Sequence, residues 1–173
     1  MRNTQSENLK EHSLDVAVIA HSLAVISNMR FGNRLNADHA AVIGMFHDTS
    51  EIITGDMPTP VKYQDENFKA MYKQMEETAN ENLIALLPDD LKAVYTELLT
   101  PDGKDEALLT LVKAADKICA LIKCMEEKNA GNREFDKARE AQLSSLKEMN
   151  LPEVNVFMEE FLPAFELNLD QMQ

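Results

Sequence analysis

A carboxylate stands among apolar residues in the second half of this sequence. Asp116 follows Val112 by four residues and precedes Cys119 by three, so a helix over this stretch would carry it on its apolar stripe. A lone carboxylate buried there would cost several kcal/mol to desolvate. Either a buried salt bridge or a helix cap compensates it, or Asp116 is a metal ligand.

A second group with chemical potential is the dipeptide His47-Asp48, at the end of an apolar run. A His-Asp pair by itself is weak evidence, because such pairs also occur by chance on surfaces or as helix caps. Glu51 adds to it, since it follows His47 by four residues and Asp48 by three and would share their face of one helix. From there a carboxylate can touch a water bound between them, as a catalytic base would.

A third group is His12, expected in the first turn of a helix. The helix dipole disfavours an imidazolium at that end and so favours a neutral ring that can bind a metal, although a solvated histidine is the alternative. The joint set is His12, His47, Asp48 and Asp116, two His and two Asp from three predicted helices. Mixed nitrogen and oxygen ligands suit one divalent transition metal such as Mn, Fe, Co or Zn rather than Ca or Mg.

Helices must position these residues, because apolar residues recur at spacings of three and four, and Gly and Pro number only 5 and 6. We expect one all-α domain over residues 1–173, with about six to seven helices. The expected helices run from Asn8 to before Gly32, from Asn36 to about Ile53, from Phe68 to before Pro88, over 91–99, from about 106 to 128, and over two further segments separated by Pro152.

Composition restricts the partners. With 17 Lys+Arg against 30 Asp+Glu, the net charge of −13 argues against long nucleic acid. A small phosphorylated substrate would need a bound cation and local donors, for which Arg2 and Lys62 are candidates, although most such side chains only face solvent. No apolar stretch reaches the ~18 residues of a membrane span and no signal peptide is apparent, so we expect a cytoplasmic protein. Cys119 and Cys124, expected on one helix, are interpreted as packed thiols.

Other residues are expected to have no part in the chemistry. His21 is predicted to be a core histidine and His39 to be exposed. The Met71–Met75 region is interpreted as core or dimer surface, and acidic runs such as Glu126–Glu127 as solvated faces.

The segments that carry a longer pattern are Met1-Arg2-Asn3, Glu7-Asn8, Glu11-His12-Ser13-Leu14, His47-Asp48-Thr49-Ser50-Glu51, Thr54-Gly55-Asp56-Met57-Pro58-Thr59-Pro60-Val61-Lys62 and Lys113-Ala114-Ala115-Asp116. The order His, His-Asp and distant Asp resembles the HD-domain superfamily of metal-dependent phosphohydrolases. The run 47–62 makes the chain similar to one branch in particular, the bacterial HD-domain 5′-deoxynucleotidases (YfbR-like). This resemblance spans nearly the whole chain.

The resemblance implies an HD-type helical bundle, a homodimer, and hydrolysis of nucleoside 5′-monophosphates to nucleoside and phosphate by metal-activated water. The implied metal ligands are His12, His47, Asp48 and Asp116. Glu51 would contact the attacking water as acid or base. Asp56 would belong to the same pocket, where it would help to position the substrate or protonate the leaving oxygen, while Arg2 and Lys62 would bind the phosphate.

Departures from the family pattern define what else is expected. Relatives begin with a further helix whose Arg-Trp pair excludes the ribose hydroxyl; the chain contains no Trp, and we expect that helix to be missing. The substrate is therefore written as deoxy- or ribonucleoside monophosphate. No His follows His47, which favours one metal over two. The alternatives are hydrolysis of another nucleotide such as guanosine tetraphosphate, or a non-catalytic nucleotide-binding module. Guanosine tetraphosphate hydrolases typically carry a Glu-Asp pair shortly after His-Asp, where this chain reads Thr49-Ser50-Glu51-Ile52.

Overall fold

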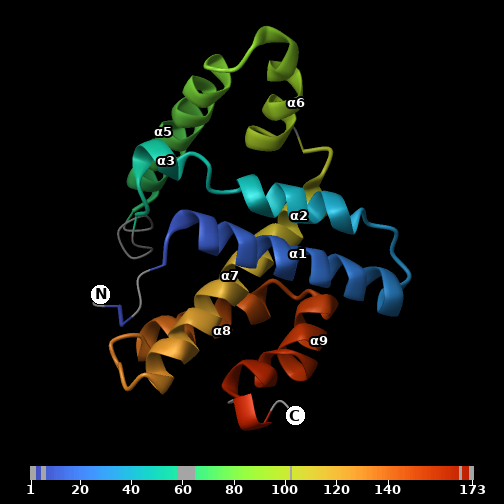
Figure 1. The fold of residues 1–173 in the computed structure, drawn as a ribbon, viewed down its shortest axis with the longest axis vertical. Coiled ribbons are helices and arrows are strands. Elements are labelled where there is room, and N and C mark those ends of the chain that lie inside the picture. Colours follow the sequence, from blue (N-terminus) through green and yellow to red (C-terminus); the bar gives the residue numbers. More distant parts are fainter. Residues whose placement is uncertain (1–2, 5–6, 58–64, 102, 168, 172–173) are drawn as a thin grey trace. The chain divides into compact units, whose positions relative to one another are not determined.

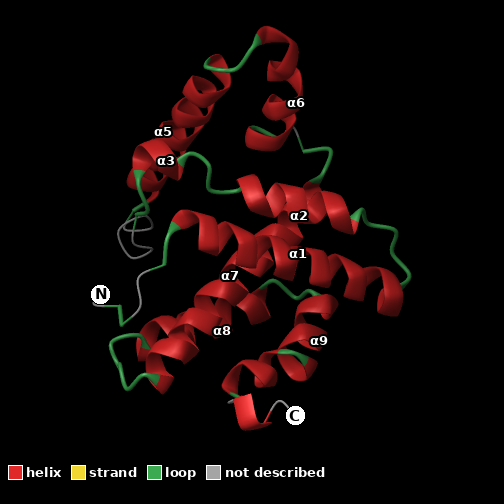
Figure 2. Cartoon of the chain, viewed as in Figure 1, coloured by secondary structure: helices red, strands yellow, loops and turns green. Residues whose placement is uncertain are grey.

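The computed structural model describes residues 3–4, 7–57, 65–101, 103–167 and 169–171, and these contain helices and no strand (Figures 1 and 2). The α-helices are α1 (Leu9–Phe31), α2 (Ala37–Phe46), α3 (Glu51–Thr54), α5 (Glu66–Ala85), α6 (Asp89–Leu99), α7 (Glu106–Asn129), α8 (Asp136–Glu148) and α9 (Pro152–Glu160), followed by the 3₁₀ turns η1 (Leu162–Glu166) and η2 (Leu169–Gln171). The chain divides into two compact units, a first unit of residues 1–45 and 106–173 and a second unit of residues 46–105.

Helix α1 begins and ends where its sequence signals predict. The Asn8 side chain accepts hydrogen bonds from the backbone N–H groups of Lys10 and Glu11, and the Glu11 carboxylate accepts one from the Asn8 N–H. This capping box satisfies donors that the first turn leaves without helical partners. At the other end Gly32 adopts φ 73°, a left-handed conformation that glycine enters at little cost. The α1 N-terminus, and with it His12, is thus fixed locally.

The core of the first unit lies where α7 packs against α1 and α8, while α1 also packs against α9. α1 is long and apolar enough to cross a membrane by length and composition alone, which is weak evidence for a membrane span, and 44% of its most apolar window is buried. α2 crosses α1 at Gly44, where an added Cβ would lie 2.9 Å from the Cα of Ala17. Only glycine allows this approach without a backbone shift.

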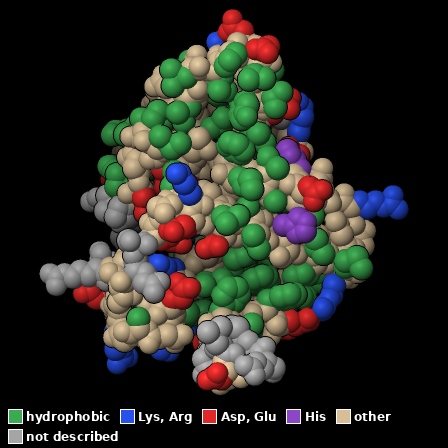
Figure 3. Space-filling model, in the orientation of Figure 1, with side chains coloured by type: hydrophobic (Ala, Val, Ile, Leu, Met, Phe, Trp, Pro, Cys, Tyr) green, Lys and Arg blue, Asp and Glu red, His purple; other side chains and the backbone are tan. Residues whose placement is uncertain are grey.

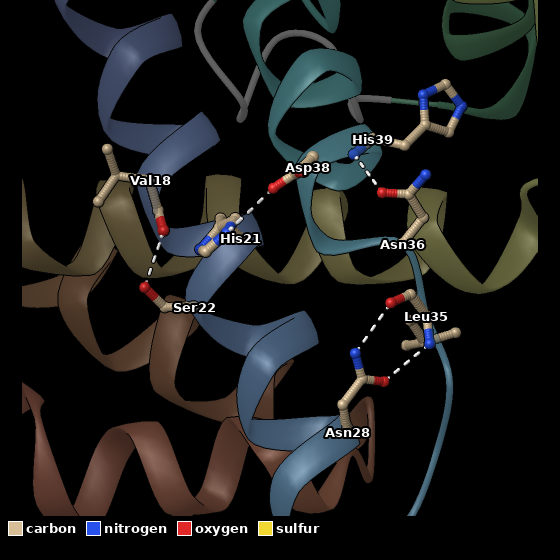
Figure 4. Close-up of polar contacts among 8 residues, drawn as sticks. All are labelled: Val18, His21, Ser22, Asn28, Leu35, Asn36, Asp38 and His39. Atoms are coloured by element: carbon tan, nitrogen blue, oxygen red, sulfur yellow. Dashed lines mark hydrogen bonds and ion pairs between the residues drawn. The ribbon is translucent and has the colours of Figure 1, made fainter.

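The connection between α1 and α2 is held by side-chain hydrogen bonds (Figure 4). The Asn28 amide donates to the carbonyl of Leu35 at 2.8 Å and accepts from the Leu35 N–H at 2.7 Å, and the Asn36 side chain accepts from the His39 N–H at 3.0 Å. Asn36 therefore caps α2 as predicted. These bonds fix where α2 starts relative to α1 within the first unit.

The predicted second helix is too long at its C-terminal end. α2 stops at Phe46, and residues 47–50 form turns before the short α3. Thr49 donates to the Phe46 carbonyl from both its backbone N–H, at 3.2 Å, and its hydroxyl, at 2.7 Å, and the Glu51 N–H donates to the Asp48 carbonyl at 2.9 Å. Bonds of this i→i+3 type replace the helical pattern, so His47 and Asp48 lie in a turn.

The second unit is built on α5, which contacts both α3 and α6. Tyr72 is 2% exposed, and its hydroxyl donates to the carbonyl of Gly55 at 3.2 Å, just after α3. Asn80 donates to the carbonyl of Leu99 at 2.9 Å, which ties the end of α6 to α5, and Phe46 meets Tyr95 edge to face. These contacts hold the segment that contains the His47–Asp48 turn against the helix pair α5 and α6.

Hydrophobic side chains are abundant on the face shown in Figure 3. On α1, Leu14 and Val18 are 55% and 58% exposed, so they do not belong to the core that their spacing indicates. In the second unit, Met71 and Met75 are also exposed and line a groove of about 440 Å³ together with Ile53. The side chains of Met71 and Met75 are therefore surface rather than core.

Candidate active site

The first unit brings His12 and Asp116 together. The imidazole Nε2 of His12, in the capped N-terminal part of α1, lies 3.3 Å from a carboxylate oxygen of Asp116 on α7. The two residues are 104 positions apart in sequence (116 − 12 = 104), and the packing of α1 on α7 makes them neighbours. A nitrogen and an oxygen atom that could both bind a metal ion therefore face each other.

The environment of Asp116 differs from the expectation. Its side chain is 47% exposed, while the neighbouring Ala115 is fully buried and Cys119 is 8% exposed. The predicted burial of this carboxylate is wrong, and with it the interpretation as a buried salt bridge. Asp116 lies at the solvent edge of the α7 stripe, next to His12, whose side chain is 21% exposed.

The second unit contains the other His–carboxylate pair. The Nε2 of His47 lies 2.8 Å from a carboxylate oxygen of Asp48, and the two side chains are 12% and 27% exposed. Both residues sit in the turn after α2 that the Thr49 hydrogen bonds define. Neighbouring side chains on a regular helix diverge, so it is the turn that lets these two meet.

Glu51 and Asp56 also belong to the second unit. Glu51 is the first residue of α3 and is partly buried, three residues after Asp48 in the same turn structure. Asp56 is exposed and follows Gly55, whose φ of 70° directs the chain away from α3. Arg2 and Lys62, the candidate phosphate contacts, lie outside the described residues.

The two cysteines are buried, as predicted for packed thiols. Burial raises the pKa of Cys119, and the negative charges of Asp116, Asp15 and Glu7 raise it further. Burial also raises the pKa of Cys124. The raised pKa values favour the protonated thiols, in keeping with packed side chains.

Two histidines outside these pairs are placed differently from the predictions. His21 on α1 is 44% exposed, with its Nε2 3.6 Å from a carboxylate oxygen of Asp38, and is therefore no core histidine (Figure 4). His39 is partly buried rather than exposed, and its ring points away from His21 in the same view.

Sequence reasoning missed Glu127. It was interpreted with Glu126 as a solvated face, but only Glu126 is exposed; Glu127 is 1% exposed. Its carboxylate accepts hydrogen bonds from Thr4 and Asn132. The available signal was its position, since it follows Cys124 by three residues on the apolar stripe of α7.

Comparison with known proteins shows the family to which this chain belongs. A family model described as 5′-deoxynucleotidase YfbR-like matches residues 1–165. The chain belongs to the YfbR-like 5′-deoxynucleotidase family. Similar curated proteins are the 5′-deoxynucleotidases of Shewanella oneidensis, 45% identical over 99% of this chain and 88% of that protein, and of Vibrio atlanticus, 42% identical over 99% and 89%. The 5′-deoxynucleotidase YfbR of Salmonella arizonae is 44% identical over 99% and 86%.

A solved structure of an HD-domain phosphohydrolase has a similar fold. The crystal structure of an HD-domain phosphohydrolase from Listeria innocua aligns with a TM-score of 0.84 and 26% identity, over 99% of this chain and 82% of that one. Together these comparisons confirm the resemblance that the sequence motifs indicate, the all-helical fold and the phosphohydrolase class. The roles of individual residues stay predictions.

Proposed function

We propose that this YfbR-like protein hydrolyses deoxy- or ribonucleoside 5′-monophosphates to nucleoside and phosphate, using one divalent transition metal. The observation that carries the proposal is the family match over residues 1–165 together with curated 5′-deoxynucleotidases more than 40% identical over 99% of the chain. Deoxyribose selection is the finer part of this proposal.

The proposed metal ligands are His12, His47, Asp48 and Asp116. Two ligand atoms that each lie about 2.1 Å from one ion are about 3.0 Å apart at a right angle and about 3.4 Å apart at the tetrahedral angle. The N–O separations within the two His–carboxylate pairs, 3.3 Å and 2.8 Å, are close to these values. The donor set of imidazole and carboxylate fits Mn, Co, Zn or a similar metal.

The metal would lower the pKa of a water toward neutrality and offset negative charge on the phosphoryl oxygens. Around it, Glu51 accepts the proton of the attacking water. Asp56 positions the substrate or protonates the oxygen that leaves with the nucleoside. Arg2 and Lys62 donate hydrogen bonds to the phosphate, which the net charge of −13 would otherwise repel.

The proposal extends to the molecule's setting. A net charge of −13 disfavours long nucleic acid, so the partner is the small nucleotide, without a membrane, in the cytoplasm. A homodimer is supported by the apolar residues that α1 exposes, among them Leu14, Val18 and Met29. The one domain over residues 1–173 also remains part of the proposal.

The test is phosphate release from a panel of deoxy- and ribonucleoside 5′-monophosphates with Mn²⁺, Co²⁺ or Zn²⁺ added. We expect release with at least one metal, and loss of both bound metal and activity in His12→Ala, His47→Ala and Asp116→Ala. Metal content is measured by inductively coupled plasma mass spectrometry on the purified proteins. His21→Ala is the matched control, since it removes a partly exposed histidine from the same helix as His12, and should keep both.

Two outcomes would contradict the proposal. Folded protein that releases no phosphate with any metal, but binds nucleotide, would favour a non-catalytic nucleotide-binding module. Release from guanosine tetraphosphate, and from none of the monophosphates, would assign the other substrate.

A further inference from the structure

Helix α3 carries the proposed base Glu51, but it cannot hold itself in place. It has four residues, whereas isolated helices shorter than about 12 to 15 residues are marginal in water. None of its residues is buried, and Ile52 and Ile53 are 66% and 54% exposed. Neither helix propensity nor burial of its own side chains therefore fixes the position of this helix.

The C-terminal end of α3 is tied to α5 by Tyr72. The Tyr72 hydroxyl donates to the Gly55 carbonyl at 3.2 Å, across 17 positions of sequence. Tyr72 is 2% exposed and is the largest fully buried side chain among the described residues. A closely packed ring of this size has little freedom to move, so its hydroxyl is a fixed donor next to α3.

Gly55 connects this buried tyrosine to Glu51. The Gly55 N–H donates to the Glu51 carbonyl at 2.9 Å, which closes the single turn of α3. The φ of Gly55, 70°, lies in the region that favours glycine, so the backbone can leave α3 here while the Gly55 carbonyl stays bonded to Tyr72. One residue therefore bonds both the first residue of α3 and the long helix α5.

A second hydroxyl near Gly55 does not replace that of Tyr72. Thr54 Oγ1 lies 3.2 Å from the Gly55 carbonyl oxygen and 3.3 Å from the Ser50 carbonyl oxygen. A hydroxyl has one proton to donate, so it can bond only one of these carbonyls at a time. Thr54 also belongs to α3 itself. Of these two donors, only Tyr72 joins α3 to a neighbouring helix.

From these contacts we propose that Tyr72 is a positioning residue for the catalytic step. It holds α3 so that the Glu51 carboxylate reaches the attacking water, and all the residues of this link belong to the second unit. This inference rests on the proposed function, in which Glu51 accepts the proton of that water. Loss of the hydroxyl keeps the proposed metal ligands but lets Glu51 leave the geometry that proton transfer requires, which slows the chemical step.

The experiment compares Tyr72→Phe with Tyr95→Phe in the full-length protein loaded with Mn²⁺, using deoxyadenosine 5′-monophosphate as substrate. Tyr72→Phe removes the donor and keeps the buried ring. We expect its single-turnover rate to fall about three- to tenfold, with KM within about twofold of the wild type and metal content unchanged. Tyr95→Phe is the matched control, because it removes a hydroxyl from a partly buried tyrosine on α6 and should change none of these.

A double variant separates the positioning of Glu51 from a general structural defect. In Glu51→Gln the proposed base is absent, so adding Tyr72→Phe should slow the remaining reaction by less than about twofold. The same three- to tenfold fall in both backgrounds would overturn the proposal. An unchanged single-turnover rate, a rise in KM alone or a loss of metal in Tyr72→Phe would overturn it as well.

Gly55→Ala tests the other half of the link if Tyr72→Phe fails to fold. Beyond its chain neighbours, no described atom lies within 4 Å of the added Cβ, but the φ of 70° strains alanine, so the turn should shift and the single-turnover rate should fall. A wild-type rate in Gly55→Ala would overturn the proposal.

Hydrogen exchange distinguishes failure of this inference from failure of the proposed function. If the wild-type protein released no phosphate with any metal, the proposed function would fail first. The link itself would still be testable, because the Gly55 N–H should exchange faster in Tyr72→Phe than in Tyr95→Phe. Equal exchange in the two variants would show that Tyr72 does not hold α3.

Discussion

At the scale of single residues, Glu51 has the most specific proposed role. It is the first residue of α3, is partly buried and follows the His47–Asp48 pair closely in sequence. It is not among the proposed metal ligands. We predict that Glu51→Gln keeps its metal and loses turnover by about 10²- to 10⁴-fold, the contribution typical of one acid–base group. Metal content and phosphate release measured on one preparation check this.

The control for Glu51 is Glu81→Gln, which removes an exposed carboxylate from α5 in the same unit. It should change neither readout. Full activity in Glu51→Gln would remove Glu51 from the mechanism, and loss of metal would make it a ligand instead.

Residue types and spacing located the candidate groups but not their environments. The apolar stripe of α7 indicated a buried Asp116, and the charge run indicated a solvated Glu127, whereas Asp116 is half exposed and Glu127 is buried. Apolar periodicity defines which side chains share one face of a helix. It does not define which parts of that face are covered by other segments of the chain. Thr4 and Asn132 cover Glu127, and no local sequence signal predicts a partner 123 residues away.

At the scale of helices, the sequence predicted helix boundaries best where a capping residue or a glycine marks them. α1 lies between Asn8 and Gly32 as expected, because both signals act within a few residues. The second helix was extended to Ile53 because apolar residues continue past Phe46, but the Thr49 hydroxyl and N–H bond the Phe46 carbonyl instead. Ile52 and Ile53 are consequently 66% and 54% exposed.

The contact of α2 with α1 gives a prediction at this scale. In Gly44→Ala the new Cβ would lie 2.9 Å from the Cα of Ala17, closer than such atoms can pack. Glycine to alanine normally stabilises a helix by about 1 kcal/mol, but overpacking costs about 1–3 kcal/mol, so we expect net destabilisation. Urea unfolding followed by circular dichroism measures it.

Ala17→Gly distinguishes this cause from others. The atoms that the new Cβ meets belong to the α1 backbone, so trimming the Ala17 side chain should not restore stability. If Gly44→Ala were as stable as the wild type, α1 and α2 would be able to move apart at little cost in free energy.

At the scale of the whole molecule, each unit supplies one of the proposed ligand pairs. All three tyrosines, at positions 63, 72 and 95, belong to the second unit and the chain has no Trp, so tyrosine fluorescence reports on that unit alone. We predict that Mn²⁺ or Co²⁺ raises the unfolding midpoint seen by tyrosine fluorescence, because a ligand that binds only folded protein stabilises it.

The decisive variant for this prediction is His12→Ala in the first unit. It should abolish the metal-induced shift in the tyrosine signal of the second unit, while His21→Ala should preserve it. A shift that survives His12→Ala would mean that the second unit binds the metal without the first.

The first unit is made of two stretches of chain, and the second unit is the segment inserted between them. α1 comes from the stretch before residue 46 and α7 from the stretch after residue 105, so the buried α1–α7 interface joins two halves that the backbone connects only through the second unit. A single backbone cut within residues 46–105 would leave two fragments that can reassociate through that interface. The same topology makes residues 46–105 an exchangeable cassette, whose replacement from another family member would bring a new Glu51 loop while the helix that carries Asp116 stays in place.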